Sequence, residues 1–186
     1  MIDYPLRDRV IGRIVADKAA LHGDRVFMRF EQREVTYRDL DRLSNRLANG
    51  LARMGVGKGT HVALMIDNKP EIVLLYVALG KLGAVSVPLN TAAKGELLAY
   101  YVQQSNSELL VADGALIERL APIASQLKKL RGVLAFGWRE VGRHLVDAPV
   151  HERLDAREEL LRRARSAGRH RGAHVGDVRA HAAPLR

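Results

Sequence analysis

The stretch HVALMIDNKPEIVLLYVALGKLGAVSVPLN, residues 61–90, is the densest apolar block in the chain and predicts its central structural unit. The aliphatic run at residues 61–66 predicts a strand, and turn-forming residues follow it. Residues 72–82 are apolar nearly all round, as in a helix covered on several sides, and Gly83 predicts its end. A second aliphatic strand is expected at residues 84–88. The order strand, helix, strand predicts a right-handed βαβ crossover and hence a parallel sheet.

The helix expected at residues 72–82 also carries a start signal. Asn68 is the expected N-cap, since Glu71 three residues later completes a capping-box pattern. Pro70 lies in the first turn, where its missing N–H costs no intrahelical hydrogen bond. A second capping box is expected earlier in the chain, where Thr36 precedes Asp39 by three residues and opens a helix with a leucine stripe.

The segments on either side of this block alternate in the same way. Before it, residues 10–21 have the spacing of an amphipathic helix, and residues 26–30 and 34–36 predict a β-hairpin. After it come a predicted helix at 95–104, a strand at 108–112, a helical stretch at 115–130 interrupted near Pro122, and a strand at 132–136. Strands that alternate with helices predict an incomplete, doubly wound α/β sheet, mostly parallel and flanked by helices.

The character of the sequence changes at Gly137. Residues 137–186 contain no Lys, Ile, Phe, Tyr, Met, Asn, Gln or Thr, whereas Arg occurs 11 times and His 5 times. We therefore divide the chain into an α/β part, residues 1–136, and an Arg/His/Ala-rich tail, residues 137–186, that is expected to be poorly ordered. Two explanations of the tail stay open: a shifted reading frame in a gene rich in G and C, or a real basic tail.

The composition excludes several classes of protein. The chain has no cysteine, which rules out disulfide scaffolds, zinc–thiolate sites and thiol catalysis, and makes a cytoplasmic location the expectation. No apolar run is long enough to cross a bilayer. Of the net charge of +9, residues 1–136 contribute +5 and the much shorter tail +4. A basic module that binds nucleic acid or acidic partners is therefore an alternative to an enzyme.

GVGKGT at residues 55–60 has the glycine and lysine content of a phosphate-binding loop, but not its context. Gly59 separates Lys58 from Thr60, and the segment leaves a helix and enters a strand. A phosphate loop needs a strand before it and a helix after it. We therefore expect a helix C-cap followed by a turn.

Polar residues follow two of the predicted parallel strands. Asp67, Asn68 and Lys69 come after the first strand, and Asn90 and Thr91 come after the second. The carboxyl ends of parallel strands form the edge at which such sheets bind ligands. Turn chemistry alone also accounts for both asparagines, so a binding role and a purely local role stay open.

The tail offers two further candidates. His170 and His174 are four residues apart and could share a helical face as metal ligands, but Gly172 lies between them and no Cys or nearby carboxylate completes the set. Residues 157–171 are rich in Arg and could bind phosphates without reading sequence. No aromatic residue is interleaved there for stacking on bases, and Trp138 lies outside the segment. We expect no metal site in the chain.

Two motifs carry a family resemblance. VTYRDL at Val35–Leu40 and KLGAVSVPLN at Lys81–Asn90 resemble two early core motifs of the adenylate-forming acyl-CoA synthetases, the AMP-dependent synthetase/ligase superfamily. The continuation LLAYYVQQSNSELLVAD from Leu97 is similar to the same family, with a likeness to its crotonobetaine/carnitine and medium-chain acyl-CoA ligases. The resemblance covers about residues 10–136 and implies the first subdomain of the adenylate-forming fold.

The resemblance implies a two-step reaction for the full-length family. A carboxylic acid and ATP give an acyl-adenylate and pyrophosphate, and the thiol of CoA then displaces AMP, while Mg offsets charge on the phosphates. The family uses a Ser/Thr/Gly-rich phosphate loop ending in Pro-Lys-Gly, a Thr-Glu pair, a ribose-binding Asp and a C-terminal Lys. None of these can be placed on this chain, which has only three Thr and no Thr or Lys after Lys129.

We therefore expect an N-terminal fragment of an ATP-dependent acyl-CoA ligase of fatty acid metabolism, inactive alone, with no catalytic residue and no cofactor of its own. The resemblance places only the turn Asn90–Lys94 near the CoA or acyl channel, which makes Asn90 and Lys94 candidate binding residues. Two other functions stay open: the basic module, and a partial subunit that pairs with a separately encoded remainder. The incomplete sheet predicts self-association through an uncovered edge.

Overall fold

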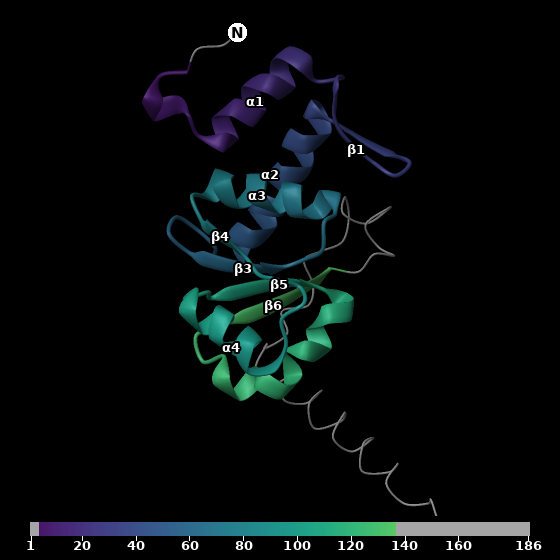
Figure 1. Ribbon diagram of the computed structural model, residues 1–186. Helices are drawn as coiled ribbons and strands as arrows, with labels where there is room; N and C mark the ends of the chain where they lie inside the picture. The colour runs from purple at the N-terminus through teal and green to yellow at the C-terminus, as the bar shows by residue number, and fades with distance from the viewer. Residues whose placement is uncertain (1–3, 137–186) are drawn as a thin grey trace, which may run out of the picture.

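The computed structural model describes residues 4–136, which form a three-layer α/β/α arrangement (Figure 1). The middle layer is a parallel sheet in the spatial order β4-β3-β5-β6, made of β3 (His61–Met65), β4 (Val85–Pro88), β5 (Leu109–Asp113) and β6 (Gly132–Phe136). One face is covered by α2 (Tyr37–Arg53) and α3 (Pro70–Leu82), and the other by α4 (Gly95–Gln104) and the 3-10 segments η2 (Gly114–Arg119) and η3 (Ala121–Gln126). The predicted doubly wound α/β sheet is confirmed.

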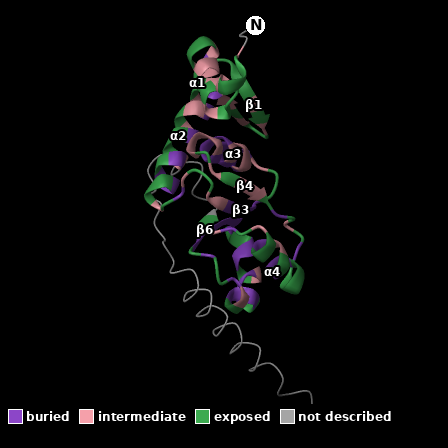
Figure 2. Ribbon diagram, turned by 90° about the vertical axis from the view of Figure 1, so that its left-hand side faces the viewer, coloured by how far each residue is buried: buried purple, intermediate pink, exposed green. Residues whose placement is uncertain are grey.

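The strand β3 is the centre of the core. Its residues Val62, Ala63, Leu64 and Met65 are all fully buried, as expected for a parallel strand covered on both faces. Val62 and Leu64 pack with α2 and α3, whereas Ala63 and Met65 pack with α4 and the 3-10 segments. Figure 2 shows the buried residues concentrated in these central layers. The densest apolar block of the sequence therefore contains the strand that both halves of the core share.

The start of α3 differs from the prediction by one residue. Lys69, not Asn68, is the N-cap, and its backbone is extended, with φ −134° and ψ 160°. Pro70 explains the difference, because a proline disfavours helical backbone at the residue before it and itself fits the first helical position. The capping box expected between Asn68 and Glu71 is wrong. The Glu71 side chain is buried instead, with Oε1 3.8 Å from Nη1 of Arg33.

The capping box at the start of α2 is confirmed. The backbone N–H of Asp39 donates to Thr36 Oγ1 at 3.1 Å, and the backbone N–H of Thr36 lies 3.5 Å from Asp39 Oδ2. Farther along, α2 is tied to α3 by Lys81, whose Nζ donates to Asp41 Oδ1 at 2.6 Å and to Asn45 Oδ1 at 2.8 Å. The first motif thus starts α2, and the first residue of the second motif fixes α3 against it.

The N-terminal elements lie outside the layer of α2 and α3 (Figure 1). They are η1 (Leu6–Asp8), α1 (Ile11–His22) and an antiparallel hairpin of β1 (Val26–Phe30) and β2 (Arg33–Thr36). The predicted helix and hairpin are confirmed. Where α1 crosses α3, a Cβ on Gly80 would overlap Cγ2 of Ile11, and one on Gly12 would lie 3.0 Å from Cγ of Lys81. The two helices approach this closely because both positions lack a side chain.

The helical stretch expected at residues 115–130 is not an α-helix. It forms two six-residue 3-10 segments, η2 and η3, with Pro122 in the first turn of the second. Proline lacks the N–H that would continue an α-helix, and short 3-10 turns are common where helical hydrogen bonding is interrupted. The remaining predicted elements, α4 at residues 95–104 and strands at 108–112 and 132–136, are present within a residue of their expected ends.

Candidate functional site

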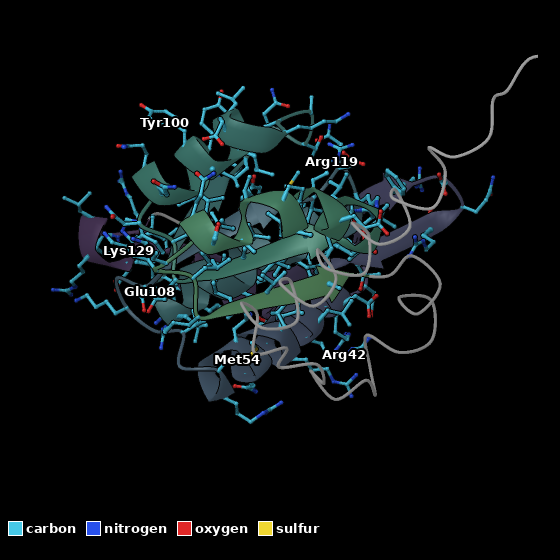
Figure 3. The ribbon with its side chains drawn as sticks, turned by 90° about the horizontal axis from the view of Figure 1, so that it is seen from below. Arg42, Met54, Tyr100, Glu108, Arg119 and Lys129 are labelled. Atoms are coloured by element: carbon cyan, nitrogen blue, oxygen red, sulfur yellow. The ribbon has the colours of Figure 1, made fainter. Side chains whose placement is uncertain are left out.

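The connections that leave β3 and β5 run toward opposite edges of the sheet. The chain leaves β3 through α3 to reach β4 on one side, and leaves β5 through η2 and η3 to reach β6 on the other. Doubly wound sheets bind ligands outside the carboxyl ends of the strands at such a switch point. Figure 3 shows Arg119 at this end of the sheet and Glu108 and Lys129 at the opposite end. The carboxyl edge is therefore the candidate functional site.

The connection after β3 is joined to the end of β5 by a buried carboxylate. Asp113 is 6% exposed, and its Oδ2 accepts a hydrogen bond from the backbone N–H of Asp67 at 3.0 Å. Its Oδ1 accepts from Lys69 Nζ at 2.8 Å. The side chains of Asp67 and Asn68 are exposed. Of the three polar residues predicted at this strand end, Lys69 is thus bound within the chain.

The connection after β4 is a tight turn. Asn90 is exposed, and its Oδ1 accepts a hydrogen bond from the backbone N–H of Ala92 at 2.8 Å. This contact is a local turn interaction, which is one of the two roles that the sequence leaves open for Asn90. The guanidinium of Arg119, in η2, donates to the carbonyl oxygen of Thr91. The segment that follows β5 therefore holds the turn that follows β4.

Lys94 ends this turn and is the N-cap of α4. Its side chain is exposed, and within residues 4–136 no carboxylate lies within 4.0 Å of its ammonium group. The structure thus brings both predicted sets to one edge, since β3 and β4 are neighbours and Leu64 is paired with Pro88. Lys94 differs from Lys69 in that its charge is available to a bound anionic group.

Asp113 and Arg119 are site residues that were not predicted. Asp113 closes a predicted strand, so the rule that identified Asp67 and Lys69 would also have found it. Its pairing with Lys69 could not be predicted, because the sequence does not show that β5 lies beside β3. Arg119 carried no signal, since it lies among mixed polar and apolar residues in a segment expected to be a plain helix.

The buried carboxylate of the carboxyl edge does not fit the role of a Mg ligand. Mg takes oxygen ligands from carboxylates and phosphates, but the buried carboxylate of Asp113 already pairs with Lys69. No cluster of three or more His, Cys, Asp or Glu side chains that could hold a metal ion occurs within residues 4–136.

The GVGKGT segment forms a turn at the opposite edge of the sheet. Gly55 and Gly59 have φ of 82° and 81°, and the backbone N–H of Gly57 donates to Thr60 Oγ1 at 3.1 Å. The segment leads from α2 into β3, so the predicted cap and turn are confirmed. A groove of about 400 Å³ lies at this same edge, between the end of α4 and the residues before β6, and Asn106 and Lys129 are among its lining residues.

The candidates in the tail lie outside the described residues. These are His170 and His174, the Arg-rich residues 157–171, and Trp138. Among residues 4–136, no helix combines the length and hydropathy needed to cross a membrane.

Comparison with known proteins relates this sheet to a family. The sequence matches the AMP-binding enzymes over residues 15–163. It is 37% identical over 122 residues to the medium/long-chain-fatty-acid–CoA ligase FadD6 of Mycobacterium tuberculosis, a match that covers 66% of this chain and 20% of that protein. It is 38% identical over 100 residues to the crotonobetaine/carnitine–CoA ligase of Salmonella paratyphi B, which covers 51% of this chain and 19% of the relative.

The fold leads to the same family. The structure resembles that of a Mycobacterium tuberculosis fatty acyl CoA synthetase with a TM-score of 0.64 and 25% identity, covering 77% of this chain and 29% of the other. The chain thus spans about a fifth of the length of its curated relatives. The family match runs past residue 136 into the predicted tail, and the division of the chain at Gly137 stays a prediction. Because the match covers well over half of its residues, the chain belongs to the AMP-binding enzyme family, and it corresponds to the N-terminal part of the family's acyl-CoA ligases.

Proposed function

We propose that this chain supplies the first α/β part of an ATP-dependent acyl-CoA ligase, which converts a carboxylic acid, ATP and CoA into acyl-CoA, AMP and pyrophosphate through an acyl-adenylate. The observation that carries the proposal is the family match over residues 15–163, which includes the whole β3–α3–β4 unit. Both curated relatives described above are CoA ligases, one acting on fatty acids and the other on crotonobetaine or carnitine.

The role of the described residues in this enzyme is to build a scaffold. Thr36, in the first motif, caps α2, and Lys81, in the second, binds α3 to α2. The second motif then ends at Asn90, where the exposed turn to Lys94 begins. Both motifs thus act through packing and turn geometry, and the turn that begins at Asn90 offers exposed polar groups to a ligand.

A chimera tests the proposed family function. Residues 15–136 would replace the matching N-terminal segment of FadD6, whose remaining sequence supplies the parts that handle ATP. We expect the chimera to catalyse fatty-acid-dependent ATP–pyrophosphate exchange, because the scaffold motifs are shared. A chimera that is folded by circular dichroism but shows no exchange would contradict the proposal.

We further infer that the chain is inactive on its own. The sequence lacks the phosphate loop and the Thr-Glu pair, and the buried carboxylate of the carboxyl edge does not fit the role of a Mg ligand. ATP–pyrophosphate exchange by the purified chain, with medium-chain and long-chain fatty acids and with carnitine, should not exceed that of a heat-killed control. Acid-dependent exchange above this control would sink the inference.

We propose that Asn90 and Lys94 lie beside the CoA or acyl channel. In the active chimera, Lys94→Ala should raise the KM for CoA by about 5-fold and leave kcat nearly unchanged, since it removes one exposed charge contact. Asn90→Ala should act in the same direction by loosening the turn. Lys58→Ala is the matched control, because Lys58 is also exposed but lies in the turn at the opposite edge. Equal effects of Lys94→Ala and Lys58→Ala would remove Lys94 from the site.

The two alternative functions, a basic binding module and a partial subunit, differ in their support. The relatives described above are CoA ligases, and neither they nor the family match supports a nucleic-acid-binding module. Pairing with a separately encoded remainder stays a prediction, as does a cytoplasmic location. Co-expression with the rest of a ligase that lacks its N-terminal segment would test the pairing, through recovery of acid-dependent exchange.

A further inference from the structure

The switch point between β3 and β5 contains a negative charge that belongs to the chain itself. We propose that the Asp113 carboxylate occupies the position at which doubly wound sheets bind a phosphate, and thereby excludes phosphate-bearing ligands from the switch point. The proposal concerns the local geometry alone, so it does not depend on the proposed ligase activity.

The contacts of Asp113 are those that a bound phosphate would make. One carboxylate oxygen accepts from a main-chain N–H, that of Asp67, at 3.0 Å, and the other accepts from the ammonium group of Lys69 at 2.8 Å. Lys69 is the N-cap of α3, which begins at Pro70, and Asp67 lies two residues before Lys69. A main-chain N–H and a lysine are among the groups that hold phosphate at the carboxyl edge of nucleotide-binding sheets.

The burial of Asp113 indicates that its carboxylate fills the position itself and does not merely lie beside it. Asp113 is 6% exposed, and it belongs to β5, whose pairing with β3 places Ala112 beside Met65. The carboxylate therefore sits on the rigid end of a central strand, not on a loop that could swing aside. An incoming anion would have to displace a buried, doubly hydrogen-bonded carboxylate, which is costly.

The start of α3 opposes a further anion in two ways. Pro70 has no N–H, so one of the donors that a helix start normally offers is missing. Glu71 lies in the same turn with its side chain 4% exposed, and it adds a second buried carboxylate, which faces Nη1 of Arg33 at 3.8 Å. The consequence is that Lys94, at the β4–α4 turn, is an exposed cation of the carboxyl edge, while a carboxylate already occupies the switch point.

The first test uses the complete wild-type chain and inorganic phosphate as the probe. Amide chemical shifts of residues 67–69 would be followed by NMR during the titration, so that phosphate bound by the Arg-rich tail does not interfere. We expect these amides to stay unchanged. A saturable shift of Asp67 and Lys69 in the wild-type chain would overturn the proposal, even if no variant folds.

The second test opens the position. Asp113→Ala removes the carboxylate, and 100 mM formate or phosphate should then raise its Tm by roughly 5 °C over NaCl of equal ionic strength, for a dissociation constant of about 10 mM. The double variant Asp113→Ala/Lys69→Met should lose this gain. A folded Asp113→Ala chain that is stabilised no more by formate or phosphate than by chloride would refute the proposal.

Asp41→Ala is the matched control for this rescue. Asp41 also pairs with a lysine, Lys81, at 2.6 Å, but between two helices and not at a strand end. Lys81 keeps two other acceptors after the substitution, the carbonyl oxygen of residue 41 and Oδ1 of Asn45. We therefore expect no anion-specific gain in Tm for this variant, and a gain equal to that of Asp113→Ala would show that the rescue is not specific to the switch point.

Discussion

The carboxylate of Asp39 combines the roles of a cap and an ion-pair partner at the start of α2. Partial burial on its own would raise the pKa of Asp39, but hydrogen bonds from Arg42 and Thr36 outweigh it and hold the pKa below its ordinary value. The Arg42 guanidinium lies 3.0 Å from Oδ1, and Thr36 Oγ1 lies 2.9 Å from Oδ2. The ionised carboxylate is thus the form that the folded chain favours.

This lowered pKa predicts a loss of stability in acid. The contribution of Asp39 is fully present above its unfolded-state pKa of about 3.9 and is lost as the pH falls through the lower folded-state pKa. Urea denaturation at pH 7 and pH 3 should therefore show a smaller drop in the free energy of unfolding for Asp39→Asn than for the wild type. Asp24→Asn is the control, because the Asp24 carboxylate is 93% exposed. Equal drops for Asp39→Asn and the wild type would contradict the assignment.

Single residues also show where prediction from sequence works and where it fails. The box between Thr36 and Asp39 was predictable because both partners lie within one turn and nothing nearby competes. The same pattern at Asn68 and Glu71 failed because Pro70 moved the N-cap to Lys69. Glu71 then faces Arg33, a residue from the hairpin whose proximity no local pattern reveals.

Among the elements, the end of α3 depends on a left-handed glycine. Gly83 has φ 66°, and a Cβ there would meet Lys58 no closer than 3.4 Å, so space is not the obstacle. Gly83→Ala should nevertheless lower the free energy of unfolding by about 1 kcal/mol, because an L-residue pays for this backbone conformation. Gly57→Ala is the matched control: no atom lies within 4 Å of its added Cβ and its φ is not positive, so little change is expected. Urea denaturation of both variants would measure the two changes in the free energy of unfolding. Equal changes would show that backbone strain is not the cause.

The elements that could be predicted are those with a strong local period. The leucine stripe gave α2, and the aliphatic runs gave the four strands of the sheet. Residues 115–130 have enough apolar residues for a helix, but Pro122 divides them into pieces too short for α-helical hydrogen bonding. Their burial comes from packing beneath β5 and α4, which is a tertiary property.

For the whole molecule, the sheet edges decide the behaviour in solution. Within residues 4–136, β4 and β6 each pair with one neighbour, β3 and β5 respectively. An open strand edge is a template for pairing with another chain. We expect the purified chain to associate, so that its sedimentation coefficient and Tm rise with concentration. A sharp melt that is independent of concentration, from a chain that sediments as a monomer, would contradict self-association.

The sequence was enough to locate the candidate site, but not to identify all of its residues and their contacts. The polar residues after two parallel strands pointed to the carboxyl edge, and the structure places both sets there. The spatial order β4-β3-β5-β6 was not predictable, since a parallel strand can be added on either side of β3. That order is what brings Asp113 to Lys69 and Arg119 to Thr91.

The crossing of α1 over α3 has a consequence for the order of folding. The β3–α3–β4 unit forms through contacts that are close in sequence, whereas the notch at Gly80 that receives Ile11 exists only when α3 has already formed. We therefore predict that α1 docks late, after the rate-limiting barrier. A side chain placed at Gly80 should leave the folding rate nearly unchanged and accelerate unfolding, so that α1 governs how long the native state lasts and not how fast it is reached.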